Sequence, residues 1–148
     1  MRAITYIINN PVDVSDTVSL ILDYISLGHC VCEDVIFEIK VILNELIVNA
    51  VQHGNNCNDS KHTYVTFKII DNYLYVSVMD EGSGFNHTKT ALINKDLDCV
   101  NNLYCDHGRG LVIVRQLCDK IKFNKCGNKV AIIKNLDNNQ NIFKEIKE

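Results

Sequence analysis

Three polar side chains at helical spacing are the first residues of this chain that could do chemistry. Glu45, Asn49 and His53 lie four residues apart in a segment that is otherwise apolar nearly all round. Residues at this spacing share one side of a helix. Burying a carboxylate or an amide costs free energy unless a partner satisfies it. Taken alone, the pattern favours an exposed polar face, and buried polar side chains that pair with a partner are the alternative.

A glycine-rich turn supplies a second candidate. Asp80 opens the segment DEGSGF, which follows a strand-like alternation of apolar and polar residues. Gly82 and Gly84 permit positive φ and leave no Cβ to block a planar ligand that approaches the backbone. The Asp80 carboxylate offers an acceptor for an exocyclic amine. A plain turn after a strand would explain the same glycines.

The segment HGRGL, residues 107–111, stands where a helix is predicted to begin. The first N–H groups of a helix have no partner within it, and together with the helix dipole they favour phosphate. Glycine at 108 and 110 would let phosphate oxygens come close to the backbone. A simple helix-initiating turn is the alternative for this motif.

Periodicity predicts the elements that must position these residues. Helices are expected over Val14–Ile25, capped by Asp13 or Ser15 and ended by Gly28, over Glu33–His53, stopped by Gly54, and from Gly108 onward. Strands are expected over 2–9, 64–70, 74–79, 121–124 and 129–134, with tight turns at Asp71-Asn72 and Gly127-Asn128 and a polar loop over 55–61.

This order of elements predicts an α+β two-layer sandwich. A mixed, mostly antiparallel sheet would be covered on one face by about three helices. Residues 1–136 are expected to form a single domain, and residues 137–148 a polar C-terminal tail.

Composition narrows the classes of function. The 148 residues carry a net charge of −3 and an isoelectric point near 5.9, which argues against a direct nucleic-acid binder. No apolar run reaches the length of a membrane span, and no secretory signal is recognisable at the N-terminus. We therefore expect a cytoplasmic protein without a membrane partner.

The seven cysteines are odd in number and irregularly spaced. They are interpreted as reduced thiols used as small apolar residues. A zinc site made of Cys57, His62, Cys105 and His107 is a weak alternative, because its spacing matches no zinc ribbon or finger.

The order and context of the three motifs are more specific than any one of them. The segments NELIVNAVQHG, VMDEGSGF and DHGRGLVIVRQLCD resemble the N box, G1 box and G2 box of the GHKL superfamily, which has the Bergerat ATP-binding fold. The resemblance covers about residues 30–135. The small size, the form of the N box and the segment GRGLVIVRQLCD are most similar to stand-alone anti-sigma-factor serine kinases.

The resemblance implies a role for each motif residue. Glu45 would be the catalytic general base, Asn49 would bind Mg²⁺, Asp80 would accept a hydrogen bond from the adenine amino group, and residues 86–107 would form a lid. His53 would stabilise the helix end and the adjacent loop, and a catalytic role is the weaker alternative. The remaining nucleotide-binding positions are Gly82, Gly84 and Phe85 around the base, and Gly108, Arg109, Gly110 and Leu111 around the phosphates.

The resemblance also implies cofactors and partners. The protein would use ATP and Mg²⁺, sequester a sigma factor, phosphorylate an anti-sigma antagonist on serine and act as a homodimer. Only some thirty residues precede the N box, too few for the dimerisation module of a histidine kinase.

Two departures from the family pattern bear on phosphoryl transfer. A threonine-rich segment before the G2 box is missing, and Asp106 and His107 stand where certain family kinases have an arginine, a part that Arg109 could take. Two alternatives therefore remain open: a nucleotide-binding regulator with little or no kinase activity, and a sigma-sequestering module in which ATP is only a structural ligand.

Overall fold

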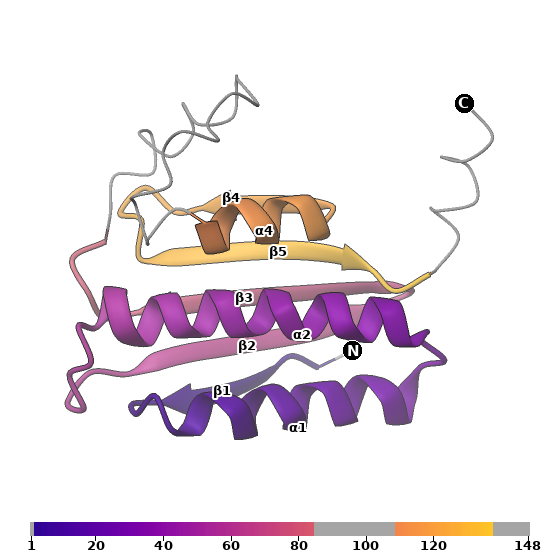
Figure 1. The fold of residues 1–148 in the computed structure, drawn as a ribbon, viewed down its shortest axis with the longest axis horizontal. Helices are drawn as coiled ribbons and strands as arrows, with labels where there is room; N and C mark the ends of the chain where they lie inside the picture. The colour runs from indigo at the N-terminus through magenta and orange to yellow at the C-terminus, as the bar shows by residue number, and fades with distance from the viewer. Residues whose placement is uncertain (1, 85–108, 138–148) are drawn as a thin grey trace.

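The computed structural model describes residues 2–84 and 109–137, and within them five strands form one sheet (Figure 1). The sheet order is β1-β2-β3-β5-β4, and each neighbouring pair is antiparallel. The strands are β1 (Ile4–Ile8), β2 (Thr63–Ile70), β3 (Tyr73–Asp80), β4 (Lys120–Phe123) and β5 (Lys129–Asn135). The two predicted hairpins, β2–β3 and β4–β5, are both confirmed.

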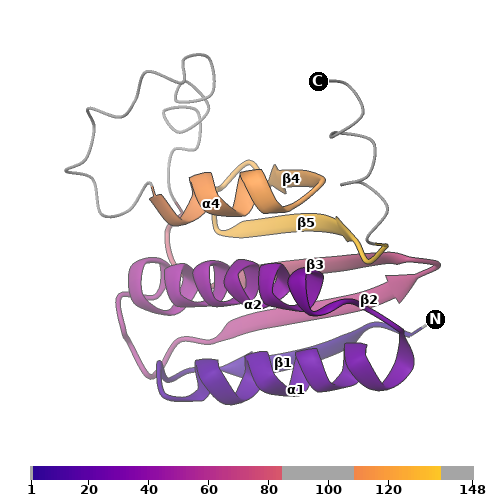
Figure 2. The ribbon, with the colours of Figure 1, turned by 45° about the vertical axis from the view of Figure 1, so that its right-hand side comes forward.

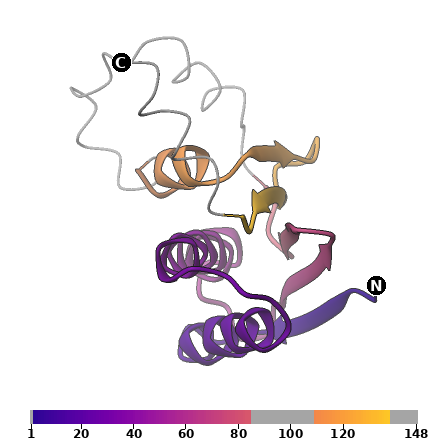
Figure 3. The ribbon, with the colours of Figure 1, turned by 90° about the vertical axis from the view of Figure 1, so that its right-hand side faces the viewer.

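The described helices all lie on one face of this sheet, as the end-on view shows (Figure 3). They are α1 (Asp13–Gly28), α2 (Glu33–Val48), which continues into a π-helical turn η1 (Asn49–Gly54), and α4 (Arg109–Leu117). The middle helix, α2, lies between α1 and α4 (Figure 2). The α+β two-layer architecture is therefore confirmed. None of the described helices is long and apolar enough to cross a membrane.

The core lies between the two layers. Alternate residues of β2 and β3, such as Val65, Phe67 and Val76, face the helices and are at most 2% exposed. They meet the apolar side of α2, where Leu43 and Ile47 are fully buried. Strand residues of the opposite parity form the other face of the sheet, which no described helix covers. The helix layer therefore has the packing needed to position a site, and the opposite face is left open.

The predicted caps of α1 are wrong. The helix begins after Val12 without a side-chain cap, and neither Asp13 nor Ser15 acts as one. Asn10 satisfies the helix end from outside instead: its Oδ1 accepts the Val12 N–H at 3.0 Å and its carbonyl accepts the Asp13 N–H at 3.1 Å. An asparagine two residues ahead forms this kind of turn readily. The helix ends at Gly28, as expected.

The predicted helix over Glu33–His53 changes character in its last turn. From Asn49 onward the hydrogen bonds close over five residues, and the Asn55 N–H donates to the Ala50 carbonyl at 2.8 Å. A π-turn is wider than an α-turn and often marks a functional site. The His53 side chain in this turn is exposed, whereas Glu45 and Asn49 are half-buried.

The described cysteines are free thiols with mixed surroundings. Cys32 and Cys118 are half-buried and pack against the core, and burial raises the pKa of the Cys118 thiol. The interpretation as small apolar residues fits these two. It is wrong for three others, which are exposed: Cys30, Cys57 and Cys126. Cys99 and Cys105 lie outside the described residues.

Candidate functional site

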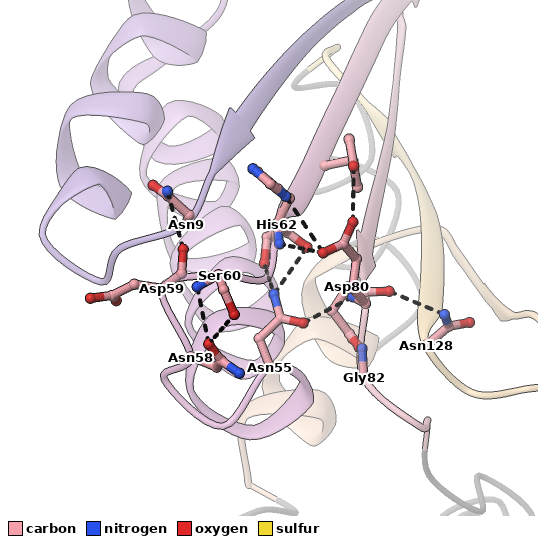
Figure 4. Close-up of polar contacts among 12 residues, drawn as sticks. Asn9, Asn55, Asn58, Asp59, Ser60, His62, Asp80, Gly82 and Asn128 are labelled. Carbon is pink, nitrogen blue, oxygen red and sulfur yellow. Dashed lines mark hydrogen bonds and ion pairs between the residues drawn. The ribbon is translucent and has the colours of Figure 1, made fainter.

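Asp80 ends β3 as a half-buried carboxylate held by its neighbours on both sides (Figure 4). Its Oδ1 accepts the Gly82 N–H at 2.8 Å. Its backbone N–H donates to the Asn128 carbonyl at 2.9 Å, and its own carbonyl accepts from Asn128 Nδ2 at 3.1 Å. The carboxylate is therefore fixed where β3 meets the turn before β5.

Two glycines make room for this carboxylate. A Cβ at Gly54 would overlap the Asp80 carboxyl group, whose Oδ1 would lie 2.7 Å away. A Cβ at Gly82 would overlap the Gly54 carbonyl oxygen and lie 2.7 Å from Asp80 Oδ1. Glycine is thus required at both positions by close approach, and Gly82 does not adopt positive φ. A planar ligand beside Asp80 meets backbone on these sides rather than side chains.

Burial raises the pKa of Asp80 above its ordinary value, and the Gly82 N–H and the charge of Lys61 oppose that shift. The effect of desolvation on the pKa of this carboxylate is thus larger than the opposing effect of its hydrogen bonds. A ligand that donates a further hydrogen bond would stabilise the ionised form. This is the chemistry expected of an acceptor for an exocyclic amine.

A second group of residues lies on α2 and η1, the helical segment that ends at Gly54. Glu45 and Asn49 are both half-buried on α2 and at the start of η1. The first turn of α4 packs directly against them. A Cβ on Gly110 would overlap the Glu45 carboxylate and would lie 3.4 Å from Asn49 Nδ2. The absence of a side chain at Gly110 therefore brings the N-terminal turn of α4 onto this carboxylate and amide.

The structure brings together most of the predicted site residues that it describes, in two groups. Glu45, Asn49 and Gly110 form one group, and Asp80 and Gly82 form the other with Gly54. The segment of α2 and η1 between Glu45 and Gly54 joins them. A single elongated ligand could contact both groups along this segment.

The other predicted positions have different surroundings. Gly84 has a positive φ of 79°, and a Cβ there would overlap the Cys126 carbonyl, so this glycine ties the turn to the β4–β5 hairpin. Leu111 is part of the buried core at 8% exposure, and Arg109 is exposed at the start of α4. Phe85 and Gly108 lie outside the described residues, as does the expected lid over 86–107.

Asn55 is a site residue that the sequence did not reveal. It is 2% exposed, and its Nδ2 donates to the His62 carbonyl and to Thr63 Oγ1, each at 3.0 Å. Its Oδ1 accepts the Glu81 N–H at 2.9 Å (Figure 4). Asn55 therefore connects the end of η1, the start of β2 and the turn that follows Asp80. An asparagine after a helix-ending glycine is a common loop residue, so its burial has no sequence signature.

The weak zinc alternative has only two of its four residues in the described part of the chain. His62 there lies beside Glu81, with Nδ1 3.5 Å from Oε2, and Glu81 also accepts the His62 N–H at 2.7 Å. These contacts, led by the backbone hydrogen bond, lower the pKa of Glu81. Within residues 2–84 and 109–137 no three His, Cys, Asp or Glu side chains gather as a metal site. Cys105 and His107 lie outside these ranges.

Comparison with known proteins gives one family. Residues 11–134 match the model of the histidine kinase-like ATPase domain. Among curated relatives, the serine-protein kinase RsbW of Oceanobacillus iheyensis is 30% identical over 91 residues, which are 59% of this chain and 56% of that protein.

Two further relatives are named anti-sigma F factor. The protein of Bacillus subtilis is 31% identical over 58 residues, which are 39% of this chain and 40% of that protein. The protein of Shouchella clausii is 28% identical over 85 residues, which are 57% of each chain. The chain thus spans from two-fifths to just over half the length of the curated relatives it matches.

Proposed function

Because the chain belongs to the histidine kinase-like ATPase domain family, we propose that its site binds Mg-ATP and that the protein is an anti-sigma regulatory factor with serine kinase activity. The observation that supports this most strongly is the placement of Asp80. It sits in a cradle of Gly54 and Gly82 at one end of the same helical segment that carries Glu45 and Asn49.

The residues fit a nucleotide at both ends. At the Asp80 end, a Cβ at Gly54 or Gly82 would fill the space beside the carboxylate, so the site requires glycine at both positions. At the other end, the first turn of α4 offers N–H groups where phosphate oxygens are favoured. Asn49 supplies an amide oxygen, which is a hard ligand. Mg²⁺ prefers oxygen ligands and takes only a few of them from the protein, the others coming from phosphates and water.

Each residue has a defined part in this proposal. Asp80 accepts a hydrogen bond from the amino group of the base, and Asn49 holds the metal through its Oδ1. Glu45 accepts the proton of a serine hydroxyl from the protein substrate, or of a water molecule. When bound, Mg-ATP supplies the phosphoryl group, and its transfer depends mostly on positioning and charge neutralisation.

The proposed partners come from the relatives. Proteins named anti-sigma F factor and serine-protein kinase RsbW suggest that this chain binds a sigma factor and phosphorylates the antagonist that releases it.

We also propose that this chain forms a homodimer. The outer side of α1 offers apolar surface for this, since Leu20 is 51% and Leu27 is 90% exposed. Light scattering at micromolar concentration would give the oligomeric state directly.

Base selectivity tests the nucleotide site. Guanine presents a carbonyl oxygen where adenine has its amino group, so it cannot donate to Asp80. We expect GTP to bind at least about tenfold more weakly than ATP, since a buried acceptor left without its donor costs about 1–3 kcal/mol. Equal affinities for the two nucleotides would remove Asp80 from the base-binding role.

Phosphoryl transfer is tested separately with γ-labelled ATP and the purified anti-sigma antagonist of the same genome. Wild type should label the antagonist on serine. Glu45→Gln, which keeps the size of the side chain but cannot accept a proton, should bind ATP and fail to label it. If wild type binds ATP without labelling any antagonist, the regulator with little or no kinase activity is the better description.

A further inference from the structure

Charge is segregated between the sheet and two of the helices, α1 and α2, whereas α4 carries two arginines, Arg109 and Arg115. Helices α1 and α2 carry seven carboxylates (Asp13, Asp16, Asp23, Glu33, Asp34, Glu38 and Glu45) and one lysine, Lys40. The strands carry five lysines (Lys68, Lys120, Lys122, Lys129 and Lys134) and one carboxylate, Asp80. Lys134 points into the helix layer and binds Glu38. The other four lysines have the opposite strand parity, so the open face of this acidic protein is basic.

The open face also has a groove that crosses the strands. The strand register aligns Thr66, Ser77, Ala131 and Lys122 in one row. Three of these side chains are small, so the middle of the row is hollow. The neighbouring row, with Lys68, Tyr75, Ile133 and Lys120, is taller. Between the rows lies a cavity of about 450 Å³ that runs from Ala3 to β4.

We propose that this groove binds an acidic segment of a partner protein in extended conformation. Four strand spacings of about 4.8 Å make the groove about 19 Å long, which about six extended residues would span. Carboxylates of such a segment would meet Lys120 and Lys122, which are exposed at one end. Its small or apolar side chains would fill the hollow over Ser77 and Ala131. The groove lies on the face opposite the helices and does not depend on nucleotide.

The chemistry of the groove favours a protein segment over a nucleic acid. Phe67 and Tyr75 are its aromatic side chains. Phe67 is only 1% exposed, and Lys68 Nζ lies over the Tyr75 ring at 5.5 Å from the centroid. The ring face is thus already covered and is not offered to a stacking base. The seven carboxylates of α1 and α2 would also repel a long polyanion.

A second copy of the chain is also a poorer occupant. A two-fold contact would set this face against itself. Lysines of both copies would then share one interface, while the carboxylates of α1 and α2 would remain on the far side. Charge complementarity therefore favours a partner that brings carboxylates of its own.

Fluorescence anisotropy with a labelled six-residue peptide of alternating glutamate and leucine tests the proposal on the full chain. Wild type should bind the peptide with a Kd below about 1 mM, which corresponds to a binding free energy of about 4 kcal/mol. Lys120→Gln/Lys122→Gln should weaken binding about 5- to 20-fold, since each exposed ion pair contributes modestly. The matched control is Lys40→Gln/Lys125→Gln, which removes two exposed lysines outside the groove. The control should bind within about twofold of wild type.

Amide shifts measured by NMR in the same titration locate the peptide, and they should be largest at Thr66, Ser77 and Ala131. The proposal would be overturned by the absence of binding at 1 mM peptide, by an equal loss of affinity in the two double variants, or by shifts confined to the helix layer. Tighter binding of a labelled DNA 12-mer that depends on the same lysines would also overturn it. A dimer that dissociates in Lys120→Gln/Lys122→Gln would also overturn it, because the face would then be a self-interface.

Discussion

The two ends of the proposed nucleotide site are built in different ways. Around Asp80, hydrogen bonds from Gly82 and Asn128, and the Asn55–Glu81 bond, join η1, β2, β3 and β5 into one network. Around Glu45 and Asn49, the described residues contribute helix packing against Gly110 and no side-chain hydrogen bond between them.

Under the proposed function, this difference separates recognition of the base from phosphoryl transfer. The Asp80 end is preorganised before any ligand arrives, so substitutions there should change affinity and stability together. The Glu45 end depends on how closely two helices approach each other. Substitutions there should change phosphoryl transfer more than they change folding, because positioning is the main requirement of that reaction.

The largest expected effect is at the helix–helix contact. Gly110→Ala places a Cβ into the Glu45 carboxylate, so α4 or Glu45 must move. A misplacement of about 1 Å can lower a rate about 100-fold, and we expect a loss of this size in the initial rate of serine phosphorylation. The melting temperature should change little. A normal rate in a folded variant would show that the contact does not position the reaction.

The next effect is on stability at the other end. Asn55→Ala removes a buried side chain that bonds Thr63 and Glu81, and it leaves the Glu81 N–H without its acceptor. This should lower the free energy of unfolding by about 2 kcal/mol. Urea denaturation measures this. Asn49→Ala is the matched control, since its half-buried amide has no such network among the described residues. An equal loss of unfolding free energy in both variants would contradict the proposed difference between the two ends of the site.

A smaller effect is expected at Gly54. Gly54→Ala sets a Cβ against the Asp80 carboxyl group, which must rotate away from its proposed base-binding position. We expect ATP affinity to fall about tenfold, with a stability loss of about 1 kcal/mol from the added crowding. Gly28→Ala, at the end of α1 with no atom within 4 Å of the new Cβ, controls for glycine replacement. It should leave ATP affinity unchanged.

The smallest effect is the pH dependence that Asp80 introduces. Its folded-state pKa is raised by burial above the ordinary value of 3.8, so its contribution to stability is present below pH 3.8 and is lost as pH rises through the folded pKa. Asp80→Asn stays neutral and lacks this loss. The melting temperature of the variant should therefore rise relative to that of wild type as pH increases above 3.8. Parallel curves would mean that Asp80 is not desolvated.

Much of this fold could be predicted from the sequence because its signals are periodic. The alternation in β2 and β3 predicted both strands to within one residue at each end, and the apolar stripe of α2 predicted the start of that helix at Glu33. The π-turn at Asn49 was not predictable, since α- and π-turns use the same residue types. The turn closes through the Asn55 N–H, which donates to the Ala50 carbonyl, and the Asn55 side chain is fixed by Thr63 and Glu81, which lie further along the chain.

The motif residues were predicted, but the reasons for two glycines were not. Positive φ was expected at Gly82 and Gly84, and only Gly84 has it. Gly82 is required instead by its approach to Gly54, and Gly54 by its approach to Asp80. Such contacts join residues some thirty positions apart, so they depend on how η1 meets β3 rather than on any local pattern.

Calorimetric titration with ATP, with and without Mg²⁺, tests most directly whether the two ends form one site. Wild type should bind ATP more tightly with Mg²⁺ present. Asn49→Ala should lose that dependence and still bind ATP without metal, while Asp80→Asn, folded like wild type, should lose binding under both conditions. If wild type did not bind ATP, or if Asp80→Asn bound it as wild type does, the proposed nucleotide site would be contradicted.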